Sequence, residues 1–412
     1  MYRRHLTATL RAALADTRVV FLQGARQTGK STLVRGLVDE LGGTYLTLDD
    51  PAVQATARED PYFFASSTRG LTVIDEVQFV PSLFPAIKRV VDNDPSPGRF
   101  LLTGSASVHL LPTISESLAG RIELIQLGPL TQSEIEGTAP DFLTRAFKPA
   151  SWSIAEYRTD RQEICSRILR GGFPEAVART SSERRTDWFG SYISTILRRD
   201  IRDLAQIEGI ADLSRLVALV AARVGGLMNN SDLSRSLSIP YTTLRRYLGL
   251  LEATFMVQPL PAWSSNLGNR LLKSPKGYLV DSGLTASLRG ETDAEALAFS
   301  GSLGPLLENF VLAEIRQQLT TSAVRAEAFH FRTIANAEVD IVLDSAASGV
   351  VGIEIKASSS VGRSDFSGLR SLADNAQGRF TGGYVLYLGD RALPFGDRYW
   401  AVPVSALWSG TP

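Results

Sequence analysis

One segment near the N-terminus has the residue types and the spacing of a phosphate-binding loop. Residues 24–31 read Gly-Ala-Arg-Gln-Thr-Gly-Lys-Ser, directly after an apolar run and directly before a helical pattern. In such a loop the backbone N–H groups face the phosphates, the lysine reaches the β and γ oxygens, and the hydroxyl holds Mg²⁺. We therefore expect ATP and Mg²⁺ as cofactors, bound by Gly24, Gln27, Thr28, Gly29, Lys30, Ser31 and Thr32.

The partner of such a loop is an acidic residue at the end of another buried strand. Residues 71–74 are apolar or β-branched and lead into Asp75 and Glu76. Asp75 is expected to bind the water shell of Mg²⁺, and Glu76 to polarise the attacking water, so the sequence predicts ATP hydrolysis. Ser105 follows a further apolar strand and could sense the γ-phosphate, although an ordinary turn explains it equally well. Arg121 is the candidate arginine finger, with a surface salt bridge as the alternative.

A second set of charged residues lies near the C-terminus. Glu308 falls on a helical pattern, Asp340 within an apolar strand, and Glu354 and Lys356 on the next strand. Because side chains alternate along a strand, Glu354 and Lys356 share one face. We expect Asp340 and Glu354 as Mg²⁺ ligands, with the Ile355 carbonyl as a further one. In that scheme Glu308 and Lys356 are catalytic, and the site cleaves phosphodiesters. A Glu–Lys pair at a sheet edge, or an inactivated nuclease fold, is the alternative.

The middle of the chain reads as two short helices joined by a turn. Residues 231–237 and 241–248 are the helical segments, and Pro240 suits the first turn of the second helix. Leu244 and Leu248 would bury one face of that helix. A winged-helix DNA reader is the leading interpretation, and a packing or protein-binding module is the alternative. The opposite face carries Thr242, Thr243, Arg245 and Arg246, which are types that contact phosphates and base edges.

Hydrophobic periodicity predicts the elements that must position these residues. Short β-branched runs alternate with amphipathic stretches over residues 16–130, which is typical of a parallel α/β sheet. The expected strands are 19–23, 45–48, 71–75, 99–103 and 122–127. A second α/β domain is expected from a helix at 303–319 and strands near 329–332, 338–343, 350–356 and 384–388.

These motifs resemble a bacterial and archaeal AAA+-type ATPase family that pairs a Gly-x-Arg-x-x-Gly-Lys loop with Asp-Glu, Leu-Thr-Gly-Ser and Leu-x-Gly-Arg. The segments 171–175, 198–200 and 276–284 resemble that family too. The C-terminal set is similar to the PD-(D/E)xK restriction-endonuclease-like superfamily, and to archaeal Holliday-junction resolvases in particular, with Val339 in place of the proline. The resemblances imply an AAA+ P-loop core (1–130), a helical lid or connector (131–210), a winged-helix-like module (211–285) and a nuclease-like domain (286–412).

Composition excludes several classes of protein. The 412 residues carry 43 basic and 43 acidic side chains, so any DNA contact must come from local patches rather than net charge. A single Cys165 forms no intramolecular disulfide, and three histidines make no zinc constellation. No apolar run reaches about 18 residues, so we expect a cytoplasmic protein without membrane contact. Only six of the basic residues are lysines, and Lys30 and Lys356 both fall in candidate sites.

The leading hypothesis is an ATP-hydrolysing, DNA-processing enzyme. It would form a homo-oligomer, with a hexameric ring as one arrangement, and act on branched or structured DNA, with no small-molecule substrate beyond ATP. One alternative is an ATP-dependent conformational switch whose C-terminal domain binds a partner without cutting. Another is a DNA-binding regulator with a catalytically inactive nuclease-like domain.

Overall fold

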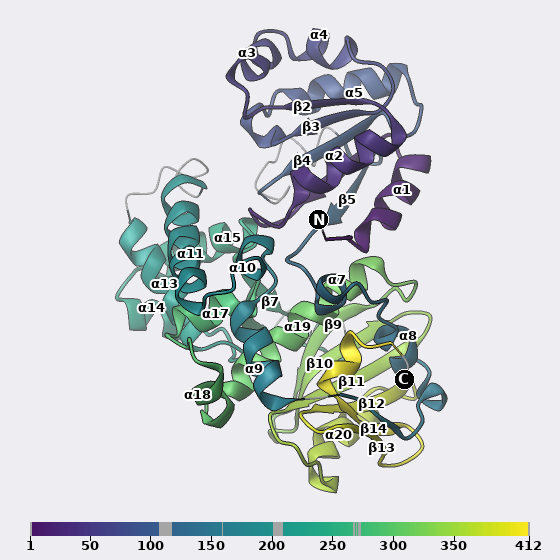
Figure 1. Ribbon diagram of the computed structural model, residues 1–412, viewed down its shortest axis with the longest axis vertical. Helices are drawn as coiled ribbons and strands as arrows, with labels where there is room; N and C mark the ends of the chain where they lie inside the picture. Colours follow the sequence, from purple (N-terminus) through teal and green to yellow (C-terminus); the bar gives the residue numbers. More distant parts are fainter. Residues whose placement is uncertain are drawn as a thin grey trace. The chain divides into compact units, whose positions relative to one another are not determined.

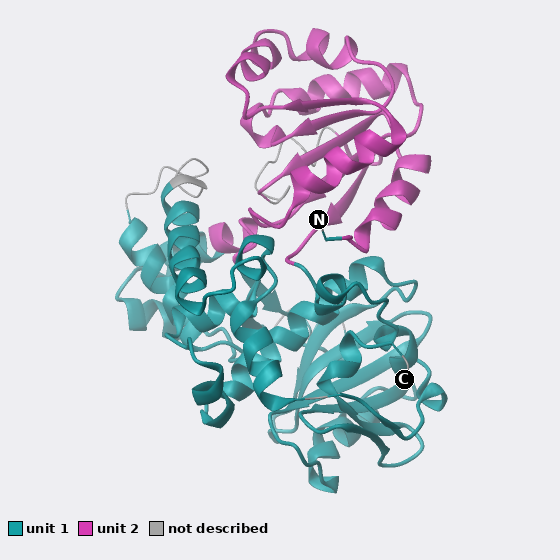
Figure 2. Ribbon diagram, in the orientation of Figure 1, with its two compact units in different colours: residues 1–2, 130–248, 257–412 teal, residues 3–129, 249–256 magenta. Residues whose placement is uncertain are grey.

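The computed structural model describes residues 2–106, 118–158, 160–200, 209–266, 268, 270 and 273–410. The chain divides into two compact units, coloured separately in Figure 2. Residues 3–129 and 249–256 form the P-loop unit, whereas residues 1–2, 130–248 and 257–412 form the C-terminal unit. The helices of the described residues include none with an apolar run long enough to cross a membrane.

The P-loop unit is built on a five-stranded parallel sheet with the strand order β2-β3-β4-β1-β5 (Figure 1). Its strands are β1 (Val19–Gln23), β2 (Thr44–Thr47), β3 (Thr72–Asp75), β4 (Phe100–Gly104) and β5 (Ile122–Gln126). All five predicted strands are confirmed to within one residue at each end. Since the strands are parallel, the segments that follow β1, β3 and β4 leave the sheet at the same edge.

Helices cover both faces of this sheet. The helices are α1 (Leu6–Asp16), α2 (Lys30–Leu41), α3 (Pro51–Glu59), α4 (Pro61–Ser66) and α5 (Leu83–Asn93), with a short 3-10 turn, η1 (Val77–Phe79). Val20 and Leu22 of β1 pack with α1 and α2, whereas Val19 and Phe21 pack with α5. A strand buried on both faces must be apolar at every position, which explains the continuous apolar run before the glycine-rich loop.

The C-terminal unit is built on a mixed seven-stranded sheet with the order β6-β13-β14-β12-β11-β10-β9. After α19 (Leu303–Thr321), the strands β9 (Glu327–Arg332), β10 (Glu338–Ser345) and β11 (Gly349–Lys356) form an antiparallel meander, and α20 (Ser367–Asn375) leads to β12 (Phe380–Tyr387), parallel to β11. The predicted helix and four strands are confirmed. The remaining strands, β6 (Ala155–Glu156), β13 (Arg391–Pro394) and β14 (Tyr399–Pro403), were not predicted.

The first part of the expected lid belongs to the body of the C-terminal unit. Phe142 of α8 (Phe142–Ala146) packs edge-on against Tyr384 of β12, with ring centroids 6.2 Å apart, and the Tyr384 hydroxyl donates to the Ala146 carbonyl at 2.9 Å. Strand β6 pairs with β13 at the edge of the same sheet. The expected connector (131–210) and nuclease-like domain (286–412) therefore share one core, because apolar residues before 160 pack on a sheet formed much later in the chain.

The rest of the expected lid and the middle module are helical, as predicted. The helices are α7 (Gln132–Glu136), α9 (Arg161–Arg170), α10 (Pro174–Val177), α11 (Ser182–Thr195), α13 (Ile210–Ala222), α14 (Asn230–Leu237), α15 (Tyr241–Ala253), α17 (Ser282–Leu288) and α18 (Ala294–Phe299). Ser238 takes the left-handed conformation in the turn between α14 and α15, and Leu244 and Leu248 are buried. An antiparallel pair, β7 (Val257–Leu260) and β8 (Lys276–Leu279), follows α15. Residues 201–208 lie outside the described part.

Residues 171–175, Gly-Gly-Phe-Pro-Glu, begin with two glycines that lie against a buried carboxylate. Asp281 caps α17, and its oxygens accept the Leu284 N–H at 2.8 Å and the Gly172 N–H at 2.7 Å. Burial raises the pKa of Asp281 to about 6. Gly171 has φ +65°, and a Cβ at this position would lie 2.3 Å from an Asp281 oxygen. Only glycine therefore lets the backbone approach this carboxylate.

Substituting Gly171→Ala should destabilise the C-terminal unit by about 2–4 kcal/mol, because a strained backbone is combined with displacement of a buried, hydrogen-bonded carboxylate. Gly290→Ala is the matched control, since φ is +75° and a Cβ there meets nothing within 4 Å. That variant should lose only about 1 kcal/mol. All five tryptophans lie in the C-terminal unit, so denaturant unfolding followed by tryptophan fluorescence reports it selectively. Equal losses in the two variants would contradict the explanation.

A second buried carboxylate makes stability depend on pH. Glu314 of α19 accepts the Gln132 N–H at 2.9 Å, its other oxygen has no partner among the described residues, and burial raises its pKa to about 8. The folded state therefore holds this proton more tightly than the unfolded state does, and stability falls as the pH rises from the ordinary pKa of 4.5 to about 8, above which it levels off. We expect the melting temperature to fall between pH 6 and pH 8, and to fall less in Glu314→Gln. An unchanged slope would count against this assignment.

Candidate functional site

The glycine-rich loop connects β1 to α2 and is shaped for phosphate. Gly24 has φ +155°, and a Cβ there would lie only 2.0 Å from the Leu127 carbonyl oxygen. Gly29, with φ +93°, precedes α2, and no described side chain caps that helix. The first N–H groups of α2 are therefore available to an anion. Lys30 is buried, and its Nζ donates to the Gly24 carbonyl at 2.9 Å.

A buried arginine that lies outside the glycine-rich loop donates hydrogen bonds to it. Arg4 donates through Nη1 to the Thr28 carbonyl at 2.7 Å and through Nη2 to the Gly128 carbonyl at 2.8 Å. The Thr28 hydroxyl donates in turn to the Ala25 carbonyl at 2.9 Å. Sequence reasoning missed Arg4, because nothing in the local pattern at residue 4 points to a contact 24 or 124 residues away. Side-chain hydrogen bonds from Arg4 and Thr28 thus help the glycines to position the loop.

The end of β3 carries Asp75, which is buried and bound by two hydroxyls. Thr103 of β4 donates to one carboxylate oxygen and Tyr45 of β2 donates to the other. The Arg35 guanidinium lies 4.4 Å from the centre of the Tyr45 ring. Burial, followed by the hydrogen bond to Asp75, raises the pKa of Tyr45. Tyr45 and Thr103 were not predicted, although both lie on strands that flank β3 in the sheet.

Glu76 and Ser105 are brought together by a side chain that the sequence did not indicate. Glu76 has φ +59°, and its N–H donates to the Thr103 hydroxyl at 3.0 Å. Gln78 donates through Nε2 to the Glu76 carboxylate and, at 3.1 Å, to the Ser105 hydroxyl. Its Oε1 is buried without a partner in the described part of the chain. Gln78 therefore orients the expected general base and leaves an acceptor beside it.

Arg121 forms a salt bridge, which was the alternative to an arginine finger. Its Nε lies 2.5 Å from an Asp92 oxygen, and both residues belong to the P-loop unit. The Arg121 side chain is 32% exposed. A role as an arginine finger stays a prediction. Ser107 and Ser117, which complete the motifs around Ser105 and Arg121, lie outside the described residues.

The residues around the loop fit ATP and Mg²⁺. Lys30 and the uncapped start of α2 would hold the phosphates, with Gln27 and Thr28 in the loop and Thr32 in the first turn. Ser31 and Asp75 would hold the cation, whose chemistry is to neutralise charge on the phosphate oxygens. Glu76 would accept the proton of the attacking water.

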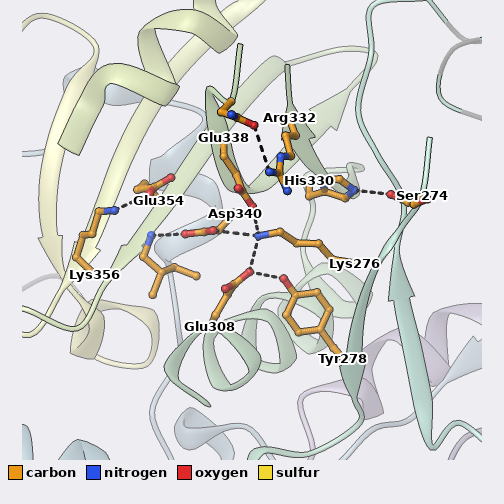
Figure 3. Close-up of polar contacts among 12 residues, drawn as sticks. Ser274, Lys276, Tyr278, Glu308, His330, Arg332, Glu338, Asp340, Glu354 and Lys356 are labelled. Carbon is orange, nitrogen blue, oxygen red and sulfur yellow. Dashed lines mark hydrogen bonds and ion pairs between the residues drawn. The ribbon is translucent and has the colours of Figure 1, made fainter. Parts of the chain in front are cut away.

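The C-terminal unit contains a cluster of carboxylates that surrounds a lysine. Lys276 of β8 is 3% exposed, and its Nζ lies 2.8 Å from Glu338, 2.9 Å from Glu308 and 3.2 Å from Asp340 (Figure 3). The Tyr278 hydroxyl donates to the same Glu308 oxygen. We call Lys276, Glu308, Glu338, Asp340 and Glu354 the carboxylate cluster. Lys276 and Glu338 were not predicted as members.

The other expected nuclease residues lie beside this cluster. Lys356 donates to Glu354 at 2.8 Å, as the shared strand face predicts. The second Asp340 oxygen accepts the Ile355 N–H at 2.9 Å. The group that Ile355 offers to Asp340 is therefore its N–H, a donor, where the sequence led us to expect its carbonyl as a metal ligand. Both oxygens of Asp340 are thus occupied by N–H donors.

Burial dominates the electrostatics of the cluster. It raises the pKa of Glu354 to about 8 and that of Glu308 to about 7, and the negative charge of Asp340 adds to both shifts. Burial lowers the pKa of Lys276, but Asp340 and Glu308 outweigh it, so the net shift is upward. One Glu354 oxygen is buried without a partner in the described part of the chain. The lysine is therefore held as a cation among carboxylates that repel one another.

This arrangement does not fit the expected Mg²⁺ site. Within the described ranges, no group of three or more His, Cys, Asp or Glu side chains is placed to hold a metal ion. Mg²⁺ needs near-octahedral oxygen ligands, and one Asp340 oxygen already binds the ammonium of Lys276, which would repel a second cation. The assignment of Asp340 and Glu354 as metal ligands is thus not supported by the geometry.

The expected DNA-contacting residues lie on one helix. Thr242, Arg245 and Arg246 of α15 are exposed, and Thr243 is half-buried. Leu244, Leu248 and Leu251 are buried. The separation into polar and apolar faces is confirmed, whereas contact with DNA stays a prediction.

Comparison with known proteins places the chain. An AAA-domain family matches residues 16–136, and two domains of unknown function, DUF8612 and DUF4143, match residues 161–295 and 303–407. The proteins Mb2031c of Mycobacterium bovis and Rv2008c of Mycobacterium tuberculosis are 35% identical over 407 residues, covering 98% of this chain and 84% of theirs. This chain belongs to their family. A Haemophilus influenzae protein is 26% identical over 255 residues, covering 59% of this chain and 56% of its own length.

Two solved structures are similar to this chain at low identity. A Walker-type ATPase of Pyrococcus abyssi is 14% identical, with a TM-score of 0.44, and covers 70% of this chain and 96% of its own. The Holliday junction branch migration motor RuvB of Thermotoga maritima is 19% identical, with a TM-score of 0.30, and covers 63% and 90%. The family match and the geometry of the P-loop unit show an AAA-type ATPase fold in residues 16–136. The resemblance of the C-terminal domain to nucleases stays a prediction.

Gln78 provides the test of this nucleotide site. Gln78→Ala should lower the turnover of ATP by about tenfold, because Glu76 loses the donor that orients it, while ATP affinity stays within about twofold. Gln54→Ala is the matched control, since Gln54 binds the Leu48 carbonyl instead of a site residue. Lys30→Ala should lose nucleotide binding itself. Wild-type turnover in Gln78→Ala, measured by phosphate release, would show that Gln78 does not orient the base.

Proposed function

We propose that this family member is an oligomeric, ATP-driven DNA-processing protein that binds branched or structured DNA through α14 and α15. The observation that carries the proposal is the polar face of α15. Arg245 and Arg246 are exposed there, next to Thr242, on a helix whose other face is buried. Guanidinium and hydroxyl groups on the second helix of such a pair are suited to phosphates and base edges.

ATP hydrolysis in the P-loop unit would supply the energy. Lys30, Ser31 and Asp75 would hold the nucleotide and its cation, and Glu76 would act as the base, oriented by Gln78. In a homo-oligomer, such as a hexameric ring, Arg121 of one copy would exchange its contact with Asp92 for the phosphates of a neighbour.

A second candidate function follows from the carboxylate cluster. With Lys276 bound to three carboxylates, the C-terminal unit would bind DNA or a protein without cutting it. The protein would then be an ATP-dependent switch or a DNA-binding regulator with a catalytically inactive nuclease-like domain. The position of Lys276 favours this version over metal-dependent cleavage.

Arg245→Glu tests the DNA surface. This variant should bind a four-way DNA junction at least tenfold more weakly than wild type, and the slope of log affinity against log salt should fall by about one, because a phosphate contact is lost. Fluorescence anisotropy at several salt concentrations gives both quantities. DNA stimulation of ATP turnover should be lost in parallel.

Arg215→Glu is the charge-matched control. Arg215 is exposed on α13, outside the helix pair, and its ion-pair partner among the described residues is Asp212, three residues earlier. It should keep near-wild-type affinity for the junction. Equal weakening in both variants would indicate a general effect of charge, and an ATP turnover indifferent to every DNA tested would count against the proposal.

A further inference from the structure

The carboxylate cluster contains its own cation. An ammonium has three N–H donors, and Lys276 has three carboxylate partners between 2.8 and 3.2 Å, one each from Glu308, Glu338 and Asp340. The donors of this lysine are therefore fully used. Figure 3 shows its Nζ among the three acidic side chains.

The lysine side chain is buried together with its partners. Its side chain is 3% exposed, so the charge is shielded from water and depends on its carboxylate partners. The backbone beside it is paired as well: Gly277 donates to the Gly226 carbonyl at 2.9 Å, and the Gly225 N–H donates to the Gly277 carbonyl at 3.0 Å. A Cβ at Gly225 would lie 2.9 Å from the second oxygen of Glu308, which shows how closely this backbone approaches the cluster.

A divalent cation would compete with the ammonium for the same oxygens. Bound to Glu308 and Asp340 at about 2.1 Å, Mg²⁺ would lie close to Nζ, because both oxygens are within 3.2 Å of that atom. Two like charges at such a separation in a desolvated site repel strongly. The two cations therefore exclude each other.

The residue type also fits this role. Only six lysines occur among 43 basic residues, so arginine is the usual cation of this chain. A compact ammonium directs three donors at three converging carboxylates, whereas a planar guanidinium needs more room and presents its donors in one plane. An arginine at position 276 would therefore not bind all three carboxylates as the lysine does.

We propose that Lys276 takes the place of a divalent cation in the carboxylate cluster, so that the native protein holds the cluster together with a tethered ammonium and binds no Mg²⁺ or Mn²⁺ there. The same contact fastens β8 to α19 and β10. This inference does not depend on DNA binding or on ATP turnover.

Manganese binding tests the proposal. Mn²⁺ is titrated into the full-length, nucleotide-free chain, and the free ion is measured by electron paramagnetic resonance. Wild type should show no Mn²⁺ site that Asp340→Asn removes. Lys276→Met, which keeps most of the side-chain length but not the charge, should gain one site at least tenfold tighter than any in wild type, and Asp340→Asn in that background should abolish it.

Lys273→Met is the matched control. Lys273 lies three residues earlier, donates to the Arg332 carbonyl at 3.3 Å, and does not contact the cluster, so this variant should bind Mn²⁺ as wild type does. A folded Lys276→Met, verified by tryptophan fluorescence, that gains no Mn²⁺ site would overturn the proposal. If Lys276→Met does not fold, the wild-type measurement decides alone: an Mn²⁺ site in wild type that Asp340→Asn removes refutes the proposal, and its absence supports it.

Discussion

A carboxylate that leaves water must find partners, and this requirement shapes both units of the chain. Asp75 is held by two hydroxyls, and Asp281 by two backbone N–H groups. Asp340 is held by an ammonium and an N–H group. Burial without such partners would cost several kcal/mol for each charge. Each buried carboxylate therefore packs against the distant segment that supplies its hydrogen-bond or ion-pair partner.

Much of the fold could be predicted, because strand and helix periodicity is a local property of the sequence. The five strands of the P-loop unit and the α19–β12 segment follow from runs of apolar residues, and the phosphate loop follows from eight consecutive residues. The segment around Phe142 was misassigned because its own helical pattern does not reveal the sheet that it covers. Long-range packing, and not local propensity, decides to which domain such a helix belongs.

The members of the candidate sites could be predicted only in part, for the same reason. Carboxylates at strand ends are visible in the sequence, but their partners come from distant segments: Lys276 is 32 residues from Glu308 and 64 from Asp340. One signal was available. A lysine in an arginine-rich chain, followed at once by Gly277, Tyr278 and Leu279, lies in a strand that is buried throughout, and such a lysine must be paired with carboxylates.

Asp75 and Asp340 show how the nature of the partner decides what a strand carboxylate can do. The hydrogen-bond partners of Asp75 are neutral hydroxyls, so a cation can share its oxygens without displacing a charged partner. The partner of Asp340 is a fixed ammonium that already supplies the positive charge. Because a second cation must overcome this repulsion as well as displace the lysine, the nucleotide site can admit Mg²⁺ while the carboxylate cluster excludes it. An aspartate within a strand therefore favours a divalent cation in the P-loop unit and, paired with a lysine, disfavours one in the C-terminal unit.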